Sequence, residues 1–182
     1  MIHKKYIFII LLFAASNISA QFQSGKHTAG PSVGFSFLGS TIQLGINHEY
    51  GFTLRDLGIE NDAKIGIGGI FRYWSYSEVF PLVEWSYSNI LIGAQANYHF
   101  MLKDPNFDPW AGIILAYDFG TVNGSFLTSN IRINDPSNGG LWFGAQAGLR
   151  FWINNQMALS LRLGFGTLSY GALDIGLDYA FN

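Results

Sequence analysis

The stretch from Ala172 to Phe181 alternates without a break between apolar residues and small or acidic residues. Every second side chain from Leu173 to Phe181 is apolar, and the residues between them are Ala, Asp or Gly. A period of two residues indicates a β-strand, because successive side chains of a strand point to opposite faces. A tilted strand of about ten residues is long enough to cross a bilayer. The stretch therefore predicts a membrane-spanning strand near the end of the chain.

Seven earlier segments show the same alternation and are expected as strands over residues 31–38, 41–52, 63–76, 89–100, 110–120, 141–153 and 157–167. Residues Gln21–Gly30 are expected to be an irregular leader, and Ser77–Ser88 and Thr121–Gly140 are expected to be loops. No helical pattern separates the strands. The prediction is an all-β fold, an eight-stranded antiparallel up-and-down transmembrane β-barrel, with both ends on one side and an interior that side chains just fill.

Alternation alone does not say which face points outward. The alternative is a soluble, lipocalin-like ligand-binding barrel, with the apolar face inside and the polar face in water. The polar face is rich in glycine, for example at Gly66, Gly68, Gly144 and Gly148. Glycine weakens a water-facing strand, whereas a narrow barrel interior needs small residues. This pattern favours the membrane barrel.

Charged residues on the same polar face carry both signs. They are Lys64, Arg72, Arg150 and Arg162, and Glu49, Asp118, Asp174 and Asp178. On a lipid-facing surface each Arg or Lys costs roughly 2–4 kcal/mol near the midplane. The charges are therefore expected to point inward and to pair as a structural network that plugs the lumen.

The aromatic residues of the apolar face gather at the strand ends, with aliphatic residues between them. One predicted belt includes Tyr50, Tyr98 and Tyr179, and the other includes Tyr73 and Phe143. Two aromatic girdles around an aliphatic band are typical of membrane barrels.

The first twenty residues have the pattern of a secretory signal peptide. Lys4 and Lys5 precede an apolar core at Tyr6–Ala15, and small residues follow up to Ala20. Cleavage is expected after Ala20, which leaves residues 21–182 as the barrel domain. The alternative is an uncleaved anchor, but the apolar core is too short for a spanning helix.

Composition and spacing give no support for catalysis, a cofactor or a metal. The chain has no cysteine and no excess of basic residues, so no thiol chemistry and no nucleic-acid partner are expected. His27, His48 and His99 have no serine and carboxylate at a recognisable spacing. Asp104, Asn106 and Asp108 resemble the start of a calcium loop, but Pro109 replaces its glycine. We therefore expect no enzyme activity.

The chain resembles the small outer-membrane β-barrels of Gram-negative bacteria, the OmpA/OmpX-type family. The resemblance covers Gly30 to Phe181 and is carried by His48–Gly51, Asp108–Gly112, Gly148–Phe151 and Leu177–Phe181. It implies contact with outer-membrane lipid, and recognition of the closing strand by the barrel-assembly machinery. Asn182 after Phe181 is a small departure from the terminal aromatic of that family.

The expected role is structural or surface-interacting, within the cell envelope. The alternatives are a narrow, porin-like channel for small solutes and a lipid-active outer-membrane enzyme. The two predicted loops carry apolar residues that either extend the strands or bind a partner. These residues are Val79, Phe80, Leu82, Val83, Trp85, Phe126, Leu127, Ile131 and Ile133.

Overall fold

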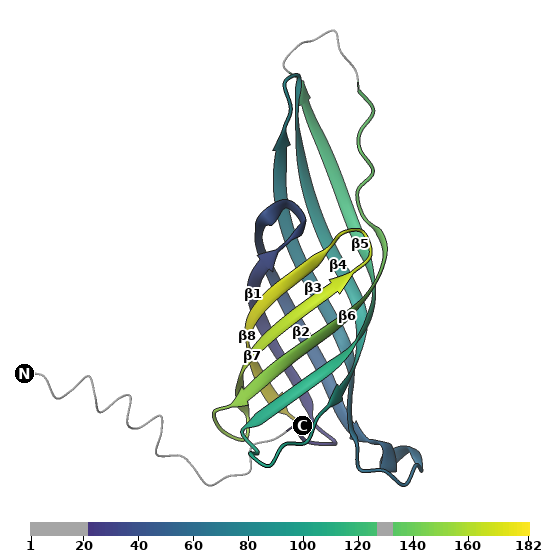
Figure 1. Cartoon of the computed structure of the whole chain (residues 1–182), viewed down its shortest axis with the longest axis vertical. Helices are drawn as coiled ribbons and strands as arrows, with labels where there is room; N and C mark the ends of the chain where they lie inside the picture. The colour runs from purple at the N-terminus through teal and green to yellow at the C-terminus, as the bar shows by residue number, and fades with distance from the viewer. Residues whose placement is uncertain (1–21, 127–132) are drawn as a thin grey trace, which may run out of the picture.

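The chain forms a closed barrel of eight antiparallel strands, each paired with its neighbours in sequence (Figure 1). The computed structural model describes residues 22–126 and 133–182. The strands are β1 His27–Ser36, β2 Thr41–Thr53, β3 Lys64–Val79, β4 Val83–His99, β5 Phe107–Phe126, β6 Gly140–Trp152, β7 Met157–Gly166 and β8 Gly171–Phe181. Two short 3-10 helices, η1 Leu38–Ser40 and η2 Leu54–Leu57, lie in the connections. The predicted fold class is confirmed.

No helix within the described ranges has the length and hydropathy needed to cross a membrane.

The barrel closes where β1 pairs with β8, for example at Val33 and Ile175. The first residue of β1, His27, pairs with Phe181 at the end of β8, so both lie at one end of the barrel, here called the terminal end. The opposite end, called the far end, carries η1 and the turns that join β3 to β4 and β7 to β8 (Figure 1).

The predicted irregular leader Gln21–Gly30 is wrong for its last four residues, whereas residues 22–26 lie outside the strands as expected. Strand β1 already begins at His27, and Phe22 is buried inside the terminal end. The expected strand began at Pro31, four residues after the observed start of β1. Proline cannot donate a ladder hydrogen bond. The pairing of β1 with β8 is interrupted at Gly30 and Pro31, which accommodates the missing donor. A Cβ atom at Gly30 would lie 1.8 Å from the carbonyl oxygen of Leu177, so only glycine permits this approach.

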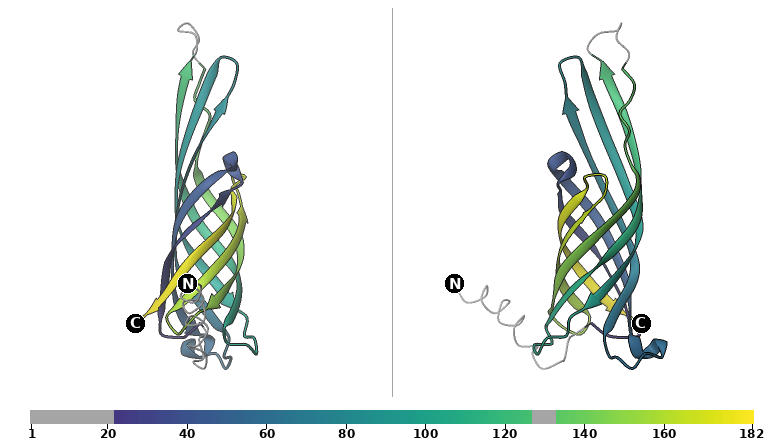
Figure 2. Two further views of the ribbon diagram at one scale, coloured as in Figure 1. Left: turned by 90° about the vertical axis from the view of Figure 1, so that its left-hand side faces the viewer. Right: turned by 45° about the vertical axis from the view of Figure 1, so that its right-hand side comes forward.

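Strands occupy most of the predicted loop Ser77–Ser88 and the first six residues of Thr121–Gly140, so the interpretation in which these segments extend the strands is confirmed there. Strand β3 continues to Val79 and β4 begins at Val83, so only a tight turn remains of Ser77–Ser88. Strand β5 continues to Phe126, where it pairs with Val83. The last pair between β2 and β3 is Gln43 with Trp74, so the β3–β5 sheet projects past the far end of the other strands (Figures 1 and 2).

The barrel buries its polar face and exposes its apolar one. Outward residues such as Ile46, Ile92 and Ile175 are more than half exposed, whereas Glu49 and Asp178 are buried. Inward glycines leave the space that large inward side chains fill. A Cβ atom at Gly66, for example, would lie 1.8 Å from a carboxylate oxygen of Glu49.

The predicted signal peptide, residues 1–20 with cleavage after Ala20, lies outside the described residues. The same is true of Leu127 and Ile131.

Candidate functional site in the barrel lumen

The lumen near the terminal end is filled by a connected network of charged side chains. Arg150 is at its centre: its Nη2 donates to Oε2 of Glu49 at 2.5 Å and its Nε donates to Oδ2 of Asp178 at 2.7 Å. Arg162 donates through Nη2 to both oxygens of the same Asp178 at 2.7 Å. Strands β2, β6, β7 and β8 therefore meet in one set of ion pairs. Each side chain in it is at most 4% exposed.

His99 and Asp108 complete this network, although the sequence analysis considered them only as a histidine without a catalytic partner and as part of a calcium-like loop. The Nδ1 atom of His99 lies 2.8 Å from Oδ1 of Asp108, and its Nε2 atom lies 3.1 Å from Oε1 of Glu49. Phe22 stacks on the His99 ring with a centroid distance of 3.6 Å. The segment that precedes β1 thus covers the network from the terminal end.

A second cluster lies in the lumen nearer the far end. Arg72 donates from Nε to Asp174 at 3.0 Å and from Nη2 to Asn47 at 2.7 Å. Gln43 also donates to Asp174, and the hydroxyl of Tyr170 donates to Oε1 of Gln43 at 2.5 Å. Strands β2, β3 and β8 and the β7–β8 turn therefore meet in one cluster around the buried carboxylate of Asp174.

The two remaining predicted lumen residues lie apart from these clusters. Lys64 is at the rim of the terminal end, where its Nζ donates to the carbonyl oxygen of Phe22 at 2.9 Å. Asp118 is buried and accepts a hydrogen bond from Asn89 at 2.8 Å. Its other carboxylate oxygen has no hydrogen-bond partner among the described residues.

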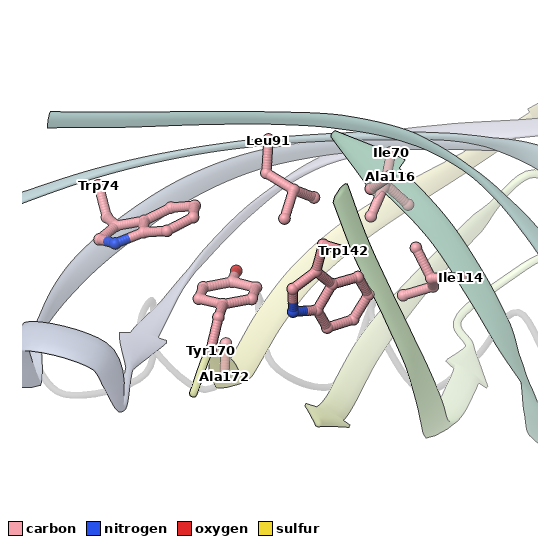
Figure 3. Packing of buried hydrophobic residues seen from close by; sticks show 8 residues of the cluster. All are labelled: Ile70, Trp74, Leu91, Ile114, Ala116, Trp142, Tyr170 and Ala172. Atoms are coloured by element: carbon pink, nitrogen blue, oxygen red, sulfur yellow. The ribbon is translucent and has the colours of Figure 1, made fainter. Parts of the chain in front are cut away.

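Aromatic side chains close the far end of the lumen. Tyr170, in the β7–β8 turn, stacks on Trp74 with a centroid distance of 4.3 Å and meets Trp142 edge-on at 5.7 Å. Leu91 and Ile114 pack in the same cluster (Figure 3). The turn that carries Tyr170 has positive φ angles at Leu168 and Ser169, an uncommon backbone conformation that aims the ring inward.

The three histidines of the described chain contact carboxylates or each other. Both ring nitrogens of His99 face carboxylates, so neither is available to take a proton from a hydroxyl. His27 and His48 contact each other, with Nδ1 of His27 3.0 Å from Nε2 of His48. Within residues 22–126 and 133–182, no three His, Cys, Asp or Glu side chains are placed to hold a metal ion.

The sequence carried a signal for the lumen residues that the prediction missed. Side chains two residues apart on a strand share a face, so Asp108 faces inward with Trp110, Gly112 and Asp118. This follows only if the strand includes Pro109, as β5 does. The carbonyl group of Pro109 accepts a hydrogen bond from the Phe100 amide at 2.8 Å. Starting the strand after the proline removed Asp108 from the inward set.

A second candidate site is the outward face of the projecting β3–β5 sheet, where polarity changes at one level. Tyr73, Ile90 and Phe119 lie side by side on β3, β4 and β5. Toward the far end, they are the last apolar residues of the outward-facing rows before the polar positions begin. The next outward positions are Ser75, Ser88 and Thr121, followed by Ser77, Ser86 and Asn123. The Oγ atoms of Ser77 and Ser86 lie 3.0 Å apart.

The inward face of this projecting sheet is apolar. Val83, Trp85 and Tyr87 are buried there and pack with Tyr76, Val122 and Phe126. Only the tip exposes large apolar side chains, with Val79, Phe80 and Leu82 between 46% and 77% exposed. Above the Ser75 level the sheet therefore has the reverse polarity of the barrel wall.

A closed eight-stranded barrel with an apolar exterior and an ion-paired interior has the architecture of the small barrels that cross membranes. No protein-family model and no curated protein matches the chain. Solved structures do match the chain in fold, and three of them are described here.

The outer membrane protein OprG from Pseudomonas aeruginosa aligns with 91% of this chain and 100% of its own, with a TM-score of 0.56 and 13% identity. The N-terminal β-barrel domain of Pseudomonas aeruginosa OprF aligns with 87% of this chain and 98% of its own, with a TM-score of 0.55 and 15% identity. A de novo designed transmembrane β-barrel aligns with 88% and 99%, with a TM-score of 0.54 and 13% identity. The expected resemblance to small outer-membrane barrels is confirmed as a likeness of fold.

Proposed function

We propose that the chain is a non-enzymatic outer-membrane barrel that presents the projecting β3–β5 sheet outside the cell. The observation that carries this proposal is the change of polarity between the Tyr73 level and the Ser75 level. Below it the outward rows are apolar, as hydrocarbon requires, and above it they carry hydroxyl and amide groups, as water or polar headgroups require. Three strands continue past that boundary, so the barrel holds a sheet beyond the membrane.

Export by a signal peptide cleaved after Ala20, and insertion by the barrel-assembly machinery through β8 and Phe181, belong to the same proposal. A plugged lumen is the second part of it. Phe22 covers the charged network at one end, and Tyr170 with Trp74 and Trp142 covers it at the other. These contacts favour a structural wall over a channel for small solutes. The paired ring nitrogens of His99 argue against a lipid-active enzyme.

The first test is heat-modifiability of the protein in outer-membrane fractions. A change in gel migration on boiling is expected for a folded membrane barrel. Recovery in the soluble fraction, with no such change, would contradict the proposal and favour the soluble lipocalin-like barrel.

The second test uses the absence of cysteine from the chain. Ser86→Cys places a thiol on the outward face of the projecting sheet, and Glu60→Cys places one in the β2–β3 connection at the other end. A membrane-impermeant maleimide should label Ser86→Cys in intact cells, and Glu60→Cys only after permeabilisation. The reverse labelling would contradict the proposed orientation.

The surface role is tested by removing the projection. Replacing residues 77–86 with Asn-Gly should leave a heat-modifiable barrel, because Asn-Gly suits a two-residue hairpin turn. We expect this variant to reach the membrane but not to complement a deletion of the gene. Full complementation would show that the projecting sheet is dispensable.

A further inference from the structure

A small cavity lies in the lumen between the charged network and the aromatic cluster. It has a volume of about 30 Å³ and is lined by Arg72, Arg162, Gln146, Trp142, Tyr170 and Asp174, with aliphatic side chains between them. A cavity needs roughly 10–15 Å³ on this measure to hold one water molecule. The cavity therefore has room for one monatomic ion or one to two waters.

Two buried donors that line this cavity have no partner among the described residues. They are the indole Nε1 of Trp142 and the Nη1 of Arg162, in side chains that are 1% and 3% exposed. Figure 3 shows the indole nitrogen on the edge of Trp142 that turns toward Tyr170. An indole N–H and a guanidinium can only donate. An occupant of the cavity that reaches either donor must accept a hydrogen bond from it.

The charges around the cavity favour an anion over a neutral acceptor. Asp174 lines it, but Gln43 and Arg72 already donate to its two oxygens. Within the described part of the chain, Arg162 forms an ion pair with Asp178, which it shares with Arg150. The positive charge of Arg162 is therefore only partly balanced, although acids outnumber arginines in the lumen as a whole. The preference for an anion therefore arises from Arg162 at this cavity and not from the total charge of the lumen.

We propose that this cavity is a binding site for a small monovalent anion of halide size, held between Trp142 Nε1 and Arg162 Nη1. The inference is independent of the surface role, because it concerns the interior of the barrel only. The small volume favours a monatomic anion over larger anions such as gluconate or sulfate.

The test is an NMR titration of the full mature chain in detergent micelles, with ¹⁵N label in the indole groups. Sodium chloride replaces sodium gluconate at constant sodium concentration, and Trp142→Phe identifies the Trp142 signal. We expect that signal to shift with a saturable dependence on chloride. Trp110 and Trp152 are internal controls, because their buried indole donors also lack described partners but do not line the cavity.

An unchanged Trp142 signal, or an equal and linear drift of all five indole signals, would overturn the proposal and leave water as the occupant. Crystals grown in sodium bromide give a second measurement that needs no variant. An anomalous peak within hydrogen-bond reach of Trp142 Nε1 and Arg162 Nη1 is expected. Ordinary density there without an anomalous signal would also overturn the proposal.

Discussion

Arg150 is the residue on which most charge compensation in the lumen converges. It is 2% exposed and lies within 4 Å of Glu49, Asp108 and Asp178. Removal of one member of a buried ion network is costly, because the remaining charges lose compensation without regaining water. A pair at the surface loses little, since solvent replaces the missing partner.

Arg150→Met should therefore destabilise the barrel by about 3–5 kcal/mol. The matched control is Arg55→Met, which breaks the exposed pair between Arg55 and Asp62 and should cost about 0–1 kcal/mol. Urea unfolding of both variants in detergent micelles measures the difference. Equal losses in the two variants would contradict a stabilising role for the buried network.

Asp56 makes the β2–β3 connection sensitive to pH. Its carboxylate accepts hydrogen bonds from the Thr53 amide at 2.7 Å and the Ser24 hydroxyl at 2.9 Å, and these bonds lower the pKa of Asp56. A lowered pKa means that the contribution to stability is present above the usual pKa of Asp and is lost as the pH falls through the lowered value.

We expect η2 and its capping box to loosen at pH values below about 4, which backbone NMR relaxation of residues 53–58 would detect. Asp56→Asn should remove this pH dependence, because the amide does not titrate. An unchanged pH profile in that variant would assign the effect to another group.

At the scale of elements, β4 passes through two environments on one face. Its outward positions from Ile90 to Tyr98 belong to the apolar band, whereas Ser86 and Ser88 belong to the polar projection. The strand itself is regular across the boundary, with continuous pairing to β3 and β5. For substitutions on the outward face of β4, the position along the strand therefore decides whether the new side chain meets the apolar band or the polar projection.

Ala94→Arg and Ser86→Arg place the same cation on the same face of β4 at two heights. Ala94→Arg should cost about 2–4 kcal/mol near the midplane, and Ser86→Arg should cost about 0–1 kcal/mol. Folding into lipid vesicles followed by urea unfolding gives both values. A similar small cost at both positions would remove the argument for a lipid-facing band.

At the scale of the whole molecule, strands form the barrel wall and their inward side chains fill the lumen, which Phe22 and Tyr170 cover at its two ends. Phe22 and Tyr170 lie outside the strands, yet both are buried in the lumen. The wall can therefore stay intact when either plug is removed.

We expect the native barrel to show no steady conductance in a planar bilayer. The double variant Phe22→Ala and Tyr170→Ala should also show none, because strand side chains such as Arg72, Arg150 and Trp142 still fill the lumen. Heat-modifiability of this variant checks that it is folded. Steady conductance of the native protein would favour the channel interpretation.

The sequence alone determined the strand number, the neighbour pairing and the division of each strand into two faces. These properties follow from local alternation, which needs no knowledge of distant residues. It also separated inward charges such as Arg162 and Asp174 from outward apolar residues. The expected strands began at Pro31 and Trp110, later than β1 and β5 do, and so left out His27 and Asp108.

Only the tertiary structure decided which side chains meet in the lumen. Glu49 contacts Arg150 and Arg72 contacts Asp174 across about a hundred residues of sequence, 101 and 102 respectively. Such contacts depend on the stagger of all the strands around a closed barrel, and local alternation carries no information about that stagger. The same holds for Phe22 and Tyr170, because no periodic pattern predicts where a side chain outside a strand will pack.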